Sequence, residues 1–190
     1  MTSIFVTVGT DHHPFDRLTG WIEWWSRQRG LDLTFLVQHG ASLPVPGARN
    51  RVSLPLRELQ EAHRHCDVVV GQVGPGTIAD ANAAGKRPLV VPRRAALGEV
   101  VDDHQVLYGQ LMAQEERVHL AEDRGSFERI LDELVADPAL GRVDPSASDA
   151  AAVAAEEVMG VVHTLVADHH RLPRLPDVAR RWVRLRRATR

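Results

Sequence analysis

A glycine-rich turn, Gly74-Pro75-Gly76, carries the strongest chemical signal in this sequence. It follows a β-branched apolar run at residues 67–70 and precedes a segment of helical composition at residues 77–84. Proline suits the first position of a helix, and glycine lets a ligand approach the main chain closely. Because free N–H groups at the start of a helix attract anions, the turn indicates a phosphate site. An ordinary turn without a ligand is the alternative.

Three polar side chains are expected near the same crevice. Asp80 lies four residues after Gly76 on one face of the expected helix, where its carboxylate suits the hydroxyls of a ribose. A solvated acid at a helix start is the alternative. His104 and Gln105 fall in the first turn of a later helix, and an imidazole and an amide suit sugar hydroxyls. No Lys-Ser or Lys-Thr pair follows the glycines, so the turn is not a P-loop.

The loop after the first expected strand, at residues 3–8, is predicted to border this crevice too, because it also follows a strand end. It contains Gly9, Thr10, His12 and His13. Its position makes His13 a candidate general base. Paired histidines in a loop are usually solvated, and we find no cysteine, histidine or carboxylate at a spacing that completes a metal site. No metal site is therefore predicted.

The elements that position these residues predict an α/β fold, with an open parallel sheet flanked by helices. Strand, turn, helix and strand follow one another between residues 67 and 91, which is the pattern of a parallel crossover unit. Further strands are expected at residues 31–38, near 51–54 and at 117–120, and helices at residues 56–65 and 125–135. Another helix is expected after residue 14, with Trp24 either widening its core face or exposed for a protein contact.

Two segments carry more specific expectations. In the helix at residues 56–65, Leu56 and Leu59 are predicted to point inward, and His63 and His65 to lie on the surface. Residues 93–101 have no clean periodicity, so this loop is interpreted as a lid over a bound ligand, with Gly98 as its pivot.

Composition limits the function classes. With 23 basic and 25 acidic side chains, the chain gives no electrostatic reason to bind nucleic acid. Cys66 is the single cysteine, which excludes a disulfide within the chain and suits a reducing cytosol. No basic-then-apolar leader and no apolar run near 20 residues is present, so secretion and membrane spanning are not expected.

The C-terminal part differs from the rest. We predict one Rossmann-like domain at residues 1–143, a linker and packing helix at 144–168, and a basic amphipathic tail helix at 169–190. The tail has eight arginines after residue 170 and one aspartate. Such a helix suits an anionic membrane surface or a partner groove, or it packs on its own domain with a solvated basic face.

Five motifs in order resemble the C-terminal domain of family 28 glycosyltransferases. They are VTVGT with PFDRL at residues 6–18, GPGTI at 74–78, GKRP at 85–88, VVPR at 90–93 and DDHQ at 102–105. The similarity covers about residues 3–120 and is strongest to small stand-alone donor subunits. These subunits belong to two-chain GlcNAc transferases and exopolysaccharide glycosyltransferases.

The resemblance implies the donor-binding half of a GT-B glycosyltransferase, at the cytoplasmic side or peripheral at the inner face of the membrane. It implies transfer of a hexose or N-acetylhexosamine from a UDP-sugar to a lipid-linked acceptor, with inversion and without a metal. A membrane-associated second chain would hold the acceptor, and a general base on that chain is the alternative to His13. The residues it implies for donor binding are Gly9 and Thr10 at the inter-domain cleft, Gly74, Gly76 and Thr77 at the diphosphate, Asp80 at the ribose, and His104 and Gln105 at the diphosphate and sugar.

Two departures bear on this resemblance. Relatives commonly have a hydroxyl and an imidazole where this chain has Gly71-Gln72-Val73, and Asp80 replaces a longer glutamate. The alternative function is therefore a non-catalytic nucleotide-sugar-binding or regulatory subunit. A Rossmann oxidoreductase is disfavoured because the first turn lacks Gly-x-Gly-x-x-Gly.

Overall fold

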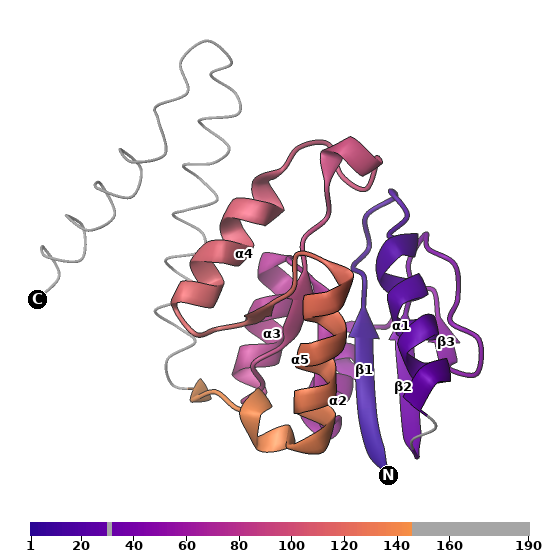
Figure 1. Cartoon of the computed structure of the whole chain (residues 1–190), viewed down its shortest axis with the longest axis vertical. Coiled ribbons are helices and arrows are strands. Elements are labelled where there is room, and N and C mark those ends of the chain that lie inside the picture. Colours follow the sequence, from indigo (N-terminus) through magenta and orange to yellow (C-terminus); the bar gives the residue numbers. More distant parts are fainter. Residues whose placement is uncertain (30–31, 146–190) are drawn as a thin grey trace, which may run out of the picture. The chain divides into compact units, whose positions relative to one another are not determined.

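The computed structural model describes residues 1–29 and 32–145 (Figure 1). These residues belong to one compact unit. Most of the predicted linker and packing helix at residues 144–168 and all of the predicted basic tail at 169–190 lie outside the described residues.

The described residues form one sheet of six parallel strands in the order β3-β2-β1-β4-β5-β6. The strands are β1 (Thr2–Thr7), β2 (Leu33–Gln38), β3 (Arg49–Arg51), β4 (Val68–Gln72), β5 (Leu89–Val91) and β6 (His119–Leu120). β1 pairs with β4, with Thr7 opposite Gly71. The chain order reverses between these two strands, which makes their carboxyl ends the topological switch point where α/β proteins bind ligands. The predicted open parallel sheet is confirmed.

Helices cover both faces of the sheet (Figure 1). They are α1 (Asp16–Arg29), α2 (Leu56–His65), α3 (Pro75–Ala83), α4 (His104–Gln114) and α5 (Arg124–Ala136), with short 3₁₀ segments η1 (Ala95–Leu97) and η2 (Pro138–Gly141). Ile4 and Val6 of β1 share a core with Ile22 of α1 and Leu131 of α5. Phe5, which points to the opposite face, packs with α2 and α3. Successive side chains of β1 thus pack on opposite faces of the sheet.

The predictions for α2 were wrong at two positions. Leu56 is 66% exposed, because it is the first residue of the helix and no core lies above it. His63 is 1% exposed, since it shares the inward face with Leu59 one turn before it. Its ring lies edge-on to Phe5, and its Nδ1 is 2.9 Å from the carbonyl oxygen of Leu59. His63 is therefore a core residue.

Two smaller predictions also changed. β3 lies at Arg49–Arg51, a few residues before the expected segment, because the ladder continues from β2 with Leu36 opposite Arg49. Trp24 is half exposed, and the guanidinium of Arg124 lies 4.3 Å from its ring centroid. It is therefore not part of the core face.

Within the described residues, none of the helices combines the length and the apolar character that crossing a bilayer requires.

Candidate functional site

The switch point is formed by two loops that follow neighbouring strands. The loop after β1 begins at Val8 and Gly9, and the loop after β4 begins at Val73 and Gly74. Gly9 has φ of +79°, a left-handed conformation that glycine adopts without strain. The glycines and His13 that the sequence predicted for the site are thus brought together at one edge of the sheet.

The start of α3 presents free backbone N–H groups. The N–H of Gly74 donates to the carbonyl oxygen of Gln72 at 2.9 Å, and that of Ile78 donates to the carbonyl oxygen of Gly74 at 3.0 Å. Among the described residues, none accepts a hydrogen bond from the N–H of Gly76 or Thr77, and no side chain caps the helix. A Cβ built at Gly76 meets nothing within 4 Å. The N–H groups of Gly76 and Thr77 are therefore unpaired among the described residues, as an anion site at a helix start requires.

A close contact holds this helix start against the sheet. A Cβ added to Gly71 would lie 2.9 Å from the Cγ2 atom of Thr77 and 3.0 Å from the carbonyl oxygen of Thr7. Only glycine permits that approach without a shift of the main chain. Gly71 therefore lets Thr77, on α3, pack directly against the end of the strand pair.

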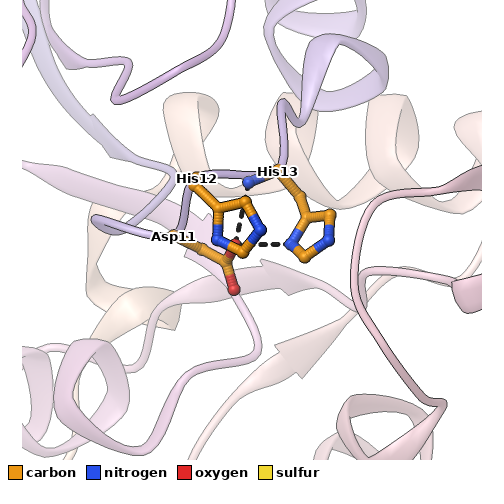
Figure 2. Close-up of side chains that lie close together, drawn as sticks. All are labelled: Asp11, His12 and His13. Atoms are coloured by element: carbon orange, nitrogen blue, oxygen red, sulfur yellow. Dashed lines mark hydrogen bonds and ion pairs between the residues drawn. The ribbon is translucent and has the colours of Figure 1, made fainter.

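The loop after β1 contains a carboxylate–histidine pair (Figure 2). The Oδ1 atom of Asp11 lies 2.7 Å from Nδ1 of His13 and accepts the main-chain N–H of His13 at 2.8 Å. With Nδ1 facing the carboxylate, Nε2 of His13 is left as the basic atom of the neutral ring. Burial raises the pKa of Asp11, but the hydrogen bonds from His13 and the charge of Arg93 outweigh it and hold the pKa below its usual value. Asp11 therefore stays ionised beside the imidazole.

His12 completes a small cluster with this pair (Figure 2). Its Nδ1 lies 3.4 Å from Oδ1 of Asp11, and its ring centroid is 3.9 Å from that of His13. One ligand atom from each of the three residues lies within 4.8 Å of the others. The sequence interpretation, which found no carboxylate at ligand spacing, overlooked Asp11. The main-chain and ring hydrogen bonds to His13 already use its Oδ1 atom.

Arg93 connects the segments of the site, and sequence reasoning missed it. Its side chain is fully buried. It donates hydrogen bonds to the carbonyl oxygens of Val8, His13 and Glu99, each at 2.8 Å, and to Oε1 of Gln72 at 2.7 Å. Burial lowers the pKa of Arg93, and the charges of Asp11 and Glu99 oppose that effect. A buried arginine with these partners holds both switch-point loops in place.

The loop at residues 93–101 is anchored by Glu99, and its role as a lid stays a prediction. Glu99 is 5% exposed and forms a two-pronged ion pair with Arg17 of α1, at 2.8 Å for each oxygen. The second oxygen also accepts the N–H of Arg94 at 2.9 Å. Gly98 has φ of +68° at the end of η1 and serves the turn, and nothing in these contacts requires it to act as a pivot.

The side chains of His104 and Gln105, in the first turn of α4, form hydrogen bonds within the protein. Gln105 is 6% exposed, and its Oε1 accepts the main-chain N–H of Arg93 at 3.1 Å. Nδ1 of His104 pairs with Oδ1 of Asp102, and the same oxygen accepts the main-chain N–H of His104. The side-chain oxygen of Gln105 thus accepts a hydrogen bond from the protein itself, and the donor-binding roles of His104 and Gln105 stay predictions.

Asp80 lies one turn into α3 and is partly buried. Burial lowers the pKa of His63, and the charge of Asp80 opposes this. The carboxylate therefore lies near α2, and its contact with a ribose stays a prediction.

A cavity of about 480 Å³ lies at the other end of the sheet. Its lining includes Ser3, Phe5 and Cys66, from the starts of β1 and β4. Burial raises the pKa of the Cys66 thiol to about 11, so the thiol is not a nucleophile at neutral pH. This cavity lies away from the switch point, where α/β proteins bind their ligands.

Solved structures that are similar to this chain include GT-B glycosyltransferases. They include MurG from Acinetobacter baumannii, with a TM-score of 0.54 and 14% identity over 82% of this chain and 49% of that chain. CalG4, the calicheamicin glycosyltransferase, has a TM-score of 0.53 and 14% identity over 86% of this chain and 44% of that chain. The glycotransferase of kitacinnamycin has a TM-score of 0.52 and 16% identity over 74% of this chain and 36% of that chain. The chain thus spans half or less of the length of each of these proteins.

The family follows from the sequence. The glycosyltransferase family 28 C-terminal domain matches residues 3–156, most of the chain. This chain therefore belongs to that family, and its sheet is one half of the GT-B architecture. No curated protein sequence matches it.

Proposed function

We propose that this chain is the donor-binding subunit of a UDP-sugar-dependent glycosyltransferase. It transfers a hexose or N-acetylhexosamine to a lipid-linked acceptor in polysaccharide or glycoconjugate synthesis. A membrane-associated partner chain holds the acceptor, as the resemblance to stand-alone donor subunits implies. The site is cytoplasmic, and the subunit binds peripherally at the inner face of the membrane when assembled.

One observation carries this proposal: the N–H groups of Gly76 and Thr77 are free at the start of α3, at the switch point of a family 28 sheet. The diphosphate of the donor binds these groups, and the helix dipole stabilises the charge that develops on the leaving UDP. This arrangement needs no divalent cation. Asp80 accepts hydrogen bonds from the ribose, and His104 and the amide nitrogen of Gln105 contact the diphosphate or the sugar.

His13 is the proposed general base. Its Nε2 takes the proton of the acceptor hydroxyl while the hydroxyl oxygen attacks the anomeric carbon from the face opposite UDP, which inverts that centre. Asp11, 2.7 Å from Nδ1, orients the ring and stabilises the imidazolium that forms. Arg93 holds the loop through the carbonyl oxygen of His13.

Calorimetric titration with UDP tests the donor site. The wild-type chain is expected to bind UDP, and Asp80→Ala is expected to weaken binding roughly 10- to 100-fold, the value of a hydrogen bond to a charged group. Asp32→Ala is the matched control, because Asp32 is exposed and its ion pair with the N-terminus spans 4.0 Å. Equal affinity of the two variants would remove Asp80 from the site. A wild-type chain that does not bind UDP would overturn the proposal.

A second experiment separates catalysis from regulation. The chain is combined with its partner subunit, UDP-sugar and lipid acceptor, and released UDP is measured for the wild type and His13→Ala. Turnover that depends on His13 supports the catalytic role. UDP binding without turnover supports the non-catalytic alternative.

A further inference from the structure

Gln72 occupies the centre of the switch point. It is the last residue of β4 and is half-buried, and its side chain runs across to the loop after β1. A Cβ added to Gly9 would lie 2.1 Å from Nε2 of Gln72, and one added to Gly74 would lie 3.0 Å from the same atom. The carboxamide nitrogen therefore rests over two glycines, one from each loop.

Arg93 fixes which way this carboxamide points. Its Nε donates to Oε1 of Gln72 at 2.7 Å. A guanidinium only donates, so the oxygen of the carboxamide must face Arg93 and the NH₂ group must face the two glycines. The orientation follows from chemistry, because a flipped amide would oppose two donors.

The NH₂ group of Gln72 is an unused donor. Among the described residues, none accepts a hydrogen bond from it at the distances found elsewhere in the site. Its nitrogen, Nε2, is not among the described side-chain atoms that are both buried and without a hydrogen-bond partner, so it is not buried. It therefore faces accessible space at the end of β4, a few residues before the N–H groups of Gly76 and Thr77 at the start of α3.

We propose that Gln72 is a donor-binding residue whose NH₂ group binds the diphosphate of the UDP-sugar between the loop after β1 and the start of α3. The inference rests on the proposed function and deepens it. The carboxamide of Gln72, which Arg93 holds, supplies a neutral hydrogen-bond donor to the diphosphate. It takes the place of the imidazole that relatives commonly have near this position.

Two variants test this contact. Gln72→Glu keeps an oxygen for Arg93 and replaces the NH₂ group with a second oxygen that repels phosphate. Gln72→Met keeps the length of the side chain and removes both polar groups. Gln114→Glu, at an exposed position of α4, controls for the added charge. Binding of UDP is measured by calorimetry and binding of uridine by titration of amide resonances, with thermal unfolding as a check on folding.

Gln72→Met is expected to weaken UDP binding roughly tenfold and Gln72→Glu up to 100-fold, as for a hydrogen bond to a charged group. Uridine, which has no phosphate, is expected to bind both variants within twofold of the wild type. UDP affinity unchanged in Gln72→Met and Gln72→Glu would overturn the inference, as would an equal loss of uridine binding. If UDP binds the wild type and the inference fails, the donor site itself still stands. If the wild type binds no UDP, both fall.

Discussion

Replacing Arg93 with alanine is expected to loosen the whole site. The guanidinium makes four hydrogen bonds of 2.7–2.8 Å, to Gln72, Val8, His13 and Glu99. Truncation leaves three main-chain carbonyl oxygens and one amide oxygen without this donor and opens a cavity. It also leaves the carboxylate of Glu99 with less positive charge around it.

Removing one partner from a buried charged network costs about 3–5 kcal/mol. The aromatic contact adds to this, because the guanidinium carbon of Arg93 lies 4.7 Å from the ring centroid of Phe15. For a domain of this size, each kcal/mol lowers the melting temperature by about 3 °C, so we expect a decrease of about 10–15 °C.

Urea unfolding measures the loss of stability in Arg93→Ala, and Arg94→Ala in the same loop is the control. The side chain of Arg94 makes a single long contact, 3.4 Å to the carbonyl oxygen of Glu122, so its loss is expected to cost under about 0.5 kcal/mol. Arg93→Ala is expected to lower the urea midpoint strongly at an unchanged m-value. If both variants lie within about 1 kcal/mol of the wild type, Arg93 does not hold the loops together.

Three further predictions concern packing, pH and catalysis. Gly71→Ala forces a Cβ against Thr77 and is expected to cost about 1–3 kcal/mol in thermal unfolding; an unchanged melting temperature would contradict the packing argument. Burial lowers the pKa of His63, so the stability it gives is complete above the unfolded pKa near 6.5 and is lost as the pH falls through that value, by at most about 1.4 kcal/mol per pH unit. His63→Phe should reduce this slope between pH 7.5 and 5.5 in urea unfolding, and an equal slope in both proteins would refute it. Asp11→Asn is expected to lower turnover of the assembled enzyme roughly 100-fold while UDP affinity stays within twofold, and full turnover would exclude Asp11 from orienting His13.

Local rules explain why the sequence predicted the sheet and the start of α3. A β-branched run, a proline at the first helical position and glycines without Cβ atoms act within a few residues, and the helix begins at Pro75 as expected. The Asp11–His13 pair was also within reach, because an aspartate often accepts the N–H two residues later.

Long-range contacts explain what the sequence did not predict. Arg93 donates hydrogen bonds to the main-chain carbonyl oxygens of His13 and Val8, which lie 80 and 85 residues earlier in the chain. The residues next to Arg93 in the sequence give no sign of these partners, so an arginine in such a loop is expected to be solvated. The burial of His63 depends in the same way on Phe5 from β1. Only the fold brings these partners together, so the sequence pattern placed His63 on the surface and assigned Arg93 no role in the site.

The central claim, that the free N–H groups at the start of α3 bind the diphosphate, is tested most directly by ¹⁵N-resolved titration of the chain with UDP. The amide resonances of Gly76 and Thr77 are expected to shift most, and to shift little with uridine. If the largest shifts instead fall at the cavity around Ser3 and Phe5, or if no resonance responds to UDP, the donor site is not at the switch point.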